Sequence, residues 1–192
     1  MNEESHSGRA GRPRDTGGRR RARQRHRAGQ SRRGRQREQL RRRFGEDTVL
    51  LAGNLKVGKS TVFSWYVGRK REHVVYPGTG VELAAGLLGT DRFARILDAP
   101  GFYSLQERSE DAFVARDLLV RRLVGGVLLV LDAKNLARGL ALALQLAEFE
   151  VPVAVALNMC DEARQRGLEI DVDKLSSLLG VPVVSTVAIE GR

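Results

Sequence analysis

The sequence predicts an α/β domain in which helices cover both faces of a mostly parallel, six-stranded sheet. Two observations support this. From residue 47 onward, short apolar runs of strand length alternate with longer segments of helical periodicity. The run at 126–132 is apolar almost throughout, as expected of a strand that is covered on both faces.

The individual elements follow from local signals. Strands 81–88 and 92–97 flank the turn sequence 89–91, which predicts a hairpin. Ser109 is a suitable N-cap, and two acidic residues follow it in the first helical turn. The segment 69–80 is polar and irregular, so we predict a loop there. The expected strands are 48–52, 81–88, 92–97, 126–132, 152–158 and 181–186, and the expected helices are 61–67, 109–123, 136–149 and 172–179.

The amino-terminal region differs in composition from the rest of the chain. Residues 1–43 contain sixteen Arg and four acidic residues, a net charge of +12, whereas the whole chain carries +10. Leu40 is the only large aliphatic residue of this region after Met1, too little apolar surface to offset the entropy of folding. We therefore predict a disordered, Arg-rich tail over 1–46. It is either a solvated extension without a role or an arm for an anionic partner, RNA or lipid.

Other features bound the location of the chain. No apolar stretch resembles a secretory signal, and no run of about 18 apolar residues could span a bilayer. Cys160 is the only cysteine, which excludes an intrachain disulfide and agrees with a reducing compartment. We expect the chain as given to be cytoplasmic.

A glycine-rich motif follows the first predicted strand. Gly53-x-x-x-x-Gly58-Lys59-Ser60 lies between an apolar run and a helix, where backbone N–H groups can surround phosphates. Lys59 should reach the β- and γ-phosphates, and the Ser60 hydroxyl should bind Mg²⁺. The alternative is a glycine-rich turn without a ligand. The predicted phosphate-binding residues are Gly53, Asn54, Leu55, Lys56, Val57, Gly58, Lys59, Ser60 and Thr61.

A second motif, Asp98-x-x-Gly101, follows the strand 92–97. A carboxylate at a strand end can hold Mg²⁺ through water, and the Gly101 amide can contact a γ-phosphate. Phe102 stands where some GTPases carry a glutamine that orients water, so no catalytic residue can be assigned here. The predicted residues of this second switch are Asp98, Ala99, Pro100 and Gly101, with Ser60 and Asp98 at the metal.

A third motif, Asn158-x-x-Asp161, follows the strand 152–158. The Asp161 carboxylate can accept hydrogen bonds from guanine N1–H and the N2 amine, a donor pair that adenine lacks. Asn158 should brace the phosphate loop and the base, and a backbone N–H near Ala188 could donate to guanine O6. We expect Cys160 to be a packing residue rather than a nucleophile. The predicted guanine-binding residues are Asn158, Met159, Asp161, Thr186, Val187 and Ala188.

In this order, the three motifs predict a P-loop NTPase fold of the Ras-like G-domain type that prefers GTP to ATP. Several longer strings resemble one family, the G domain of ferrous iron transport protein B, over residues 48–192. The strings that carry the resemblance include Asp98-Ala-Pro-Gly-Phe-Tyr-Ser-Leu105, Asp132-Ala-Lys-Asn-Leu136 and Leu157-Asn-Met-Cys-Asp-Glu-Ala-Arg164.

The resemblance implies a G domain at the cytoplasmic face of the inner membrane that regulates Fe²⁺ uptake by a membrane permease portion. It implies slow GTP hydrolysis with Mg²⁺, stimulation by K⁺ and possible homo-oligomers. In the family a last helix, a helical regulatory domain and membrane helices follow. This chain stops at Arg192, so we expect the domain at 47–192 to be incomplete at its carboxyl end.

The sequence departs from the family at two positions. Lys56 replaces an asparagine that helps to hold K⁺, and we expect its side chain to point to solvent. Gly80 replaces the threonine that binds Mg²⁺ in the GTP state, with Thr79 one residue early. Two alternatives to a slow GTPase therefore stay open: a nucleotide binder without turnover, and an RNA- or ribosome-associated GTPase that uses the basic tail. The predicted residues of the first switch are Tyr76, Pro77, Gly78, Thr79 and Gly80.

Overall fold

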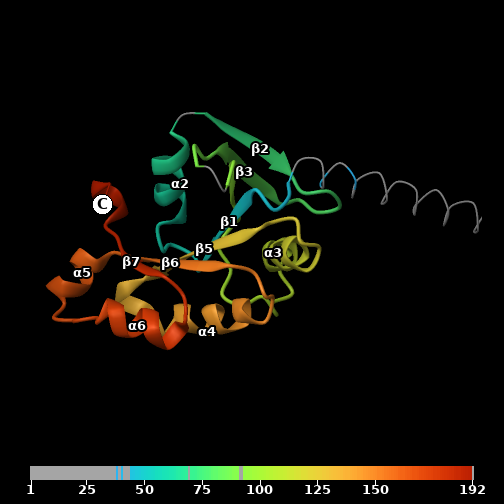
Figure 1. Cartoon of the computed structure of the whole chain (residues 1–192). Coiled ribbons are helices and arrows are strands. Elements are labelled where there is room, and N and C mark those ends of the chain that lie inside the picture. The colour runs from blue at the N-terminus through green and yellow to red at the C-terminus, as the bar shows by residue number, and fades with distance from the viewer. Residues whose placement is uncertain (1–37, 39, 41–43, 69, 91–92, 192) are drawn as a thin grey trace, which may run out of the picture. The chain divides into compact units, whose positions relative to one another are not determined.

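The structure is a computed structural model that describes residues 38, 40, 44–68, 70–90 and 93–191. The region from Leu40 onward forms one compact unit built on a seven-stranded sheet with the strand order β2-β3-β4-β1-β5-β6-β7 (Figure 1). The strands are β1 Thr48–Gly53, β2 Arg71–Val75, β3 Glu82–Leu87, β4 Arg95–Asp98, β5 Gly126–Asp132, β6 Val153–Asn158 and β7 Val183–Ser185. The helices are α2 Lys59–Val67, α3 Glu110–Val120, α4 Leu136–Ala147, α5 Cys160–Gln165 and α6 Val172–Leu179, with 3-10 helices η1 Ala133–Asn135 and η2 Ala188–Glu190.

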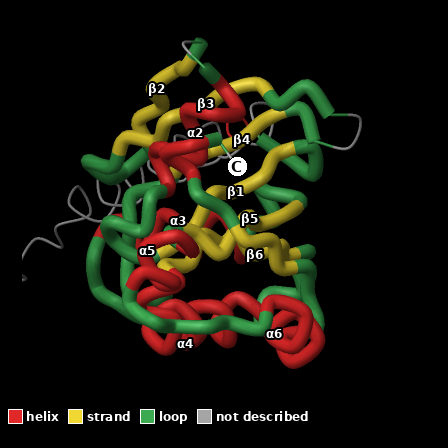
Figure 2. Tube along the Cα trace, turned by 90° about the vertical axis from the view of Figure 1, so that its left-hand side faces the viewer, coloured by secondary structure: helices red, strands yellow, loops and turns green. Residues whose placement is uncertain are grey.

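Helices cover both faces of the sheet, as predicted. In β1, Leu50 packs in the larger core cluster together with residues of α3, α4 and α6. Its neighbour Leu51 points to the opposite face and packs against Phe63 of α2. This alternation is the side-chain period of a strand. Figures 1 and 2 show α2 on one side of the sheet and α4 and α6 on the other.

The prediction of six strands was wrong, because β2 lies within the segment 69–80 that was predicted as a loop. This edge strand pairs antiparallel with β3 and buries only Val74, while its other four residues are exposed. A polar edge strand has no apolar run to reveal it, and its backbone pairing alone defines it. The pairing of β3 with β4 is also antiparallel. The remaining four pairings, β1 with β4, β1 with β5, β5 with β6 and β6 with β7, are parallel, so the sheet is mostly parallel.

The packed region reaches back further than the predicted boundary at residue 47. Leu40 and Phe44 are both buried, and the Phe44 N–H donates to the Leu40 carbonyl at 2.7 Å. Of the tail predicted over 1–46, residues 1–37, 39 and 41–43 lie outside the described residues. Within the described part of the chain, no helix is both long and apolar enough to cross a membrane.

The parallel strands bring the three sequence motifs to one edge of the sheet. Leu51 of β1 is in register with Asp98 of β4, and Gly53 is in register with Val130 of β5. Asp132 of β5 is in register with Asn158 of β6. Gly53, Asp98, Asp132 and Asn158 are the last residues of their strands, and the carboxyl ends of the strands are where open α/β sheets bind ligands.

Candidate nucleotide-binding site

The phosphate loop joins β1 to α2 and depends on two glycines. Gly53 has φ 152° and Gly58 has φ 93°, values that favour glycine. A Cβ on Gly53 would lie 2.5 Å from the Val130 carbonyl oxygen, and one on Gly58 would lie 2.3 Å from Asn158 Nδ2. Both glycines therefore allow the loop to approach its neighbours more closely than any other residue would.

Lys59 is the cation of this loop. Its side chain is buried, and Nζ donates to the carbonyl oxygens of Gly53 at 3.2 Å and Asn54 at 2.9 Å. Burial lowers the pKa of Lys59, while the carboxylates of Asp98 and Asp111 act in the opposite direction. The loop thus holds a desolvated ammonium group against its own carbonyls, where phosphate oxygens can exchange for them.

Ser60 and Asp98 form the candidate metal site. Ser60 Oγ donates to Asp98 Oδ2 at 3.1 Å, while Asp98 Oδ1 is buried and makes no hydrogen bond. Burial raises the pKa of Asp98, although the Ser60 bond and the Lys59 charge lower it. A hard divalent cation fits this oxygen pair and would give Oδ1 a partner. Mg²⁺ needs few protein ligands, because water and phosphate oxygens complete its shell.

The loop after β4 lies directly on the phosphate loop. A Cβ on Gly101 would lie 2.8 Å from Lys59 Nζ and 2.9 Å from the Leu55 nitrogen. The Phe102 N–H donates to the Gly53 carbonyl at 3.4 Å, and the Phe102 side chain is buried in the core. The structure thus brings the second predicted motif to the first, and it gives Phe102 a packing role.

Asn158 joins three segments of the site. Its Nδ2 donates to the Val57 carbonyl at 3.0 Å, and its Oδ1 accepts from the Ala188 N–H at 2.9 Å and from Thr186 Oγ1 at 3.3 Å. The Ala188 amide, which we predicted to face guanine O6, is therefore engaged by Asn158 in this structure. Asp161 starts α5 and is half-buried. Its carboxylate makes no hydrogen bond within the described part of the chain, so it can accept from a base.

The first switch is held by α3 rather than by the phosphate loop. The Gly80 N–H donates to Glu110 Oε2 at 2.9 Å, and the Tyr76 hydroxyl donates to the Asp117 carboxylate. Burial, together with this bond, raises the pKa of Tyr76. The Thr79 hydroxyl donates to the Tyr76 carbonyl at 3.0 Å and accepts from the Val81 N–H at 3.2 Å. Thr79 is therefore committed to its own turn and does not take the place of the threonine absent at Gly80.

Lys56 and Gly80, the two positions at which the sequence departs from the family, lie in different environments. Lys56 is exposed and has φ 62°, a left-handed conformation. Its side chain therefore lies at the solvent side of the loop, as expected from the sequence. Gly80 has no side chain to offer a metal, and its backbone is already bound to α3 as described above.

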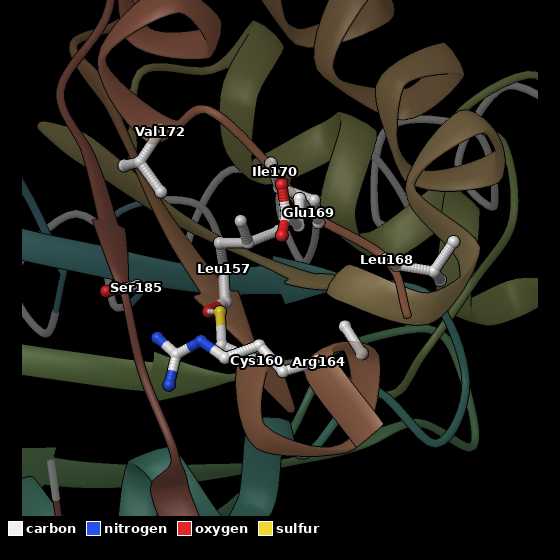
Figure 3. A pocket seen from close by; sticks show the side chains of 9 residues that line it. Leu157, Cys160, Arg164, Leu168, Glu169, Ile170, Val172 and Ser185 are labelled. Carbon is white, nitrogen blue, oxygen red and sulfur yellow. Dashed lines mark hydrogen bonds between the residues drawn. The ribbon is translucent and has the colours of Figure 1, made fainter. Parts of the chain in front are cut away.

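A pocket of about 280 Å³ lies beside the predicted guanine site, between α5, α6 and β7 (Figure 3). Cys160 lines it, and the thiol donates to the Leu157 carbonyl at 3.0 Å. Burial raises the pKa of the Cys160 thiol, which disfavours the reactive thiolate at neutral pH. The predicted packing role suits this cysteine. The pocket lining comprises Leu157, Cys160, Ala163, Arg164, Leu168, Glu169, Ile170, Val172 and Ser185.

Sequence reasoning missed three contacts around the site. Glu110, an acidic residue in the first turn of α3, accepts a hydrogen bond from the Gly80 N–H of the predicted first switch. Lys134 Nζ pairs with Glu162 Oε2 at 2.7 Å and so ties η1 to α5. The Trp65 side chain is 57% exposed, and its indole N–H donates to the Ala188 carbonyl. Each contact joins residues far apart in sequence, and no local signal indicates it.

This geometry agrees with the comparison to known proteins. The sequence profile described as ferrous iron transport protein B matches residues 47–192. The chain belongs to this family. The Fe(2+) transporter FeoB of Salmonella typhimurium is 38% identical over 150 residues, and that of Escherichia coli K12 is 36% identical over the same length. In both cases the match covers 76% of this chain but 19% of the relative, so this chain spans about a fifth of those transporters.

Solved structures of FeoB domains also match the fold. A GDP-bound variant of S. thermophilus NFeoB is 42% identical with a TM-score of 0.71, covering 74% of this chain and 56% of the other. The G domain of the T. maritima FeoB iron transporter is 36% identical with a TM-score of 0.70, covering 76% of this chain and 89% of the other. The predicted α/β P-loop fold is therefore confirmed as that of a FeoB G domain.

Proposed function

We propose that this chain binds GTP and GDP and acts as the regulatory G domain of a ferrous iron uptake system at the cytoplasmic face of the membrane. One observation carries the proposal. Asn158 bonds to the phosphate loop through Val57 and to the 186–188 segment, and Asp161 follows it by three residues, which supports a role of the Asp161 carboxylate in binding the base next to the phosphates. A guanosine diphosphate would bind the phosphate loop with its phosphates and the Asp161 carboxylate with its base.

The site residues support phosphoryl transfer by positioning and electrostatics. Lys59 would neutralise charge on the β- and γ-phosphates, and Ser60 with Asp98 would hold a Mg²⁺ ion that bridges phosphate oxygens. Phe102 is buried and offers no group to orient water. We therefore propose slow hydrolysis of GTP to GDP and phosphate.

Calorimetric titration tests the base preference. We expect GDP to bind in the presence of Mg²⁺ and ADP to bind at least about 100-fold more weakly, because a site that hydrogen-bonds the base through a carboxylate rejects bases without matching donors. The protein should be the full chain. Equal affinities for GDP and ADP, or binding of neither, would end the proposal.

Turnover tests the alternative of a nucleotide binder without hydrolysis. We expect Gly80→Thr to raise GTP turnover about tenfold by restoring a metal-binding hydroxyl, and Lys56→Asn to make turnover faster in K⁺ than in Na⁺. Phosphate release in each salt measures both. Lys174→Asn, an exposed lysine on α6, is the matched control and should change neither rate. If both site variants turn over at the wild-type rate, the interpretation of these two departures is wrong.

The partners follow from the family. We propose that the domain works with a membrane iron-permease portion, since the relatives are Fe(2+) transporters and this chain spans a fifth of their length.

For the amino-terminal tail we propose an anionic lipid surface as the partner, because residues 1–43 carry a net charge of +12. The iron-transport family disfavours the RNA- or ribosome-associated alternative.

A further inference from the structure

The single tryptophan of the chain makes a contact that no motif requires. Trp65 lies on the last part of α2, the helix whose first residues are Lys59 and Ser60. Its indole Nε1–H donates to the Ala188 carbonyl oxygen at 2.5 Å, across 123 residues of sequence. Figure 1 shows the carboxyl-terminal segment beside α2.

The indole ring also packs against the next residues of this segment. A Cβ on Gly191, where φ is 75°, would lie 2.1 Å from two ring atoms of Trp65. The ring therefore fills the space directly against the Gly191 backbone. Trp65 is 57% exposed, so hydrophobic burial alone does not explain its placement. Its distinctive contribution is to fix the segment 188–191.

The same segment is fixed from its other side by the guanine motif. The Ala188 N–H donates to Asn158 Oδ1 at 2.9 Å, so the N–H and the carbonyl of one residue have separate anchors. Asn158 in turn donates to Val57 of the phosphate loop. One rigid helix, α2, thus carries the phosphate cation at its start and holds the base-side segment near its end.

We propose that Trp65 is a positioning residue for the guanine base: by anchoring Ala188 to α2 it keeps the base-side segment in place and slows GDP release. This inference rests on the proposed function. Without the anchor, Ala188 would keep its bond to Asn158 and the bond from the Gly191 N–H within the same segment, but it would have no bond to α2, and the segment would open more often. Val57 of the phosphate loop shares a core cluster with Ala188, and the hydrogen-bonded link between them runs through Asn158, which the anchor does not touch. The loop's own grip on phosphate should therefore be unaffected.

Two variants test the anchor from opposite sides. Trp65→Phe keeps a ring and removes the N–H donor, while Gly191→Ala builds a Cβ into the ring and leaves α2 unchanged. Each should release N-methylanthraniloyl-GDP about fivefold faster than wild type, the effect of one neutral hydrogen bond. The double variant should release the labelled GDP at about the same rate as each single variant, because both substitutions break the same contact. Tyr66→Phe, on the next exposed ring of α2, should release at the wild-type rate.

Competition by inorganic pyrophosphate separates positioning from general damage. Pyrophosphate engages only the phosphate loop, so its competition constant should be unchanged in Trp65→Phe, whereas a loosened fold would weaken both ligands. In the wild type, GDP but not pyrophosphate should shift the Trp65 emission. Wild-type protein that fails to bind GDP refutes the proposed function. Wild-type protein that binds GDP while both single variants release it at the wild-type rate overturns only the role of Trp65.

Discussion

Replacing Asp161 by asparagine should change the base preference of this protein from guanine to xanthine. In guanine, N1–H and the N2 amine both donate, and in the proposed site the Asp161 carboxylate would accept both. Xanthine carries a carbonyl oxygen in place of the amine, so it presents one donor and one acceptor to the same position. The asparagine amide offers the complementary acceptor and donor. Its NH₂ group would instead face the amine of guanine, donor against donor.

The size of this effect follows from the charge of the bonds that are lost. Hydrogen bonds to a charged group contribute about 1.5–3 kcal/mol each, so GDP affinity should fall at least about 100-fold. Xanthosine diphosphate should then bind more tightly than GDP. Because Asp161 makes no hydrogen bond within the described residues, the exchange should leave the free energy of unfolding nearly unchanged.

Competition titrations with the two diphosphates measure this exchange. Asp173→Asn, at an exposed acid in the first turn of α6, is the matched control and should keep the preference for GDP. If Asp161→Asn still prefers GDP, the base does not lie against this carboxylate, and the assignment of the guanine motif fails.

Lys59→Met should weaken GDP binding far more than it weakens the fold. The methionine has a similar length but cannot donate to phosphate, and loss of the charge-assisted bonds should lower GDP affinity about 100-fold or more. The effect on folding should be small, because opposing contributions nearly cancel. Burial disfavours the ammonium and lowers its pKa, while two carbonyl bonds and the nearby Asp98 and Asp111 favour it.

Calorimetry and urea unfolding of the nucleotide-free protein measure the two effects separately. We expect the free energy of unfolding to change by about 1 kcal/mol, compared with a loss of about 3 kcal/mol in binding. Lys174→Met on the exposed side of α6 should change neither quantity. A loss of stability as large as the loss of binding would show that Lys59 mainly holds the loop together rather than the ligand.

The local motifs were predictable because each depends on residues adjacent in sequence. A glycine-rich loop needs its glycines and its lysine at fixed spacing, so Gly58 and Lys59 reveal it without knowledge of the fold. The same holds for Asp98 and for Asn158 with Asp161, each at the end of an apolar run. The two-sided sheet followed from the same runs. The strand β2 was missed, because an edge strand that buries only Val74 leaves no periodic pattern.

The sequence alone thus determined the family, the α/β fold and the candidate residues for the nucleotide site, because these depend on local backbone geometry and side-chain chemistry. Only the tertiary structure decided how these residues are held. Gly80 is bound by Glu110, Tyr76 by Asp117, and Ala188 by both Asn158 and Trp65. Such contacts join segments 30 to 123 residues apart, and only the packing of α2 and α3 beside the sheet brings their donors within reach of their acceptors.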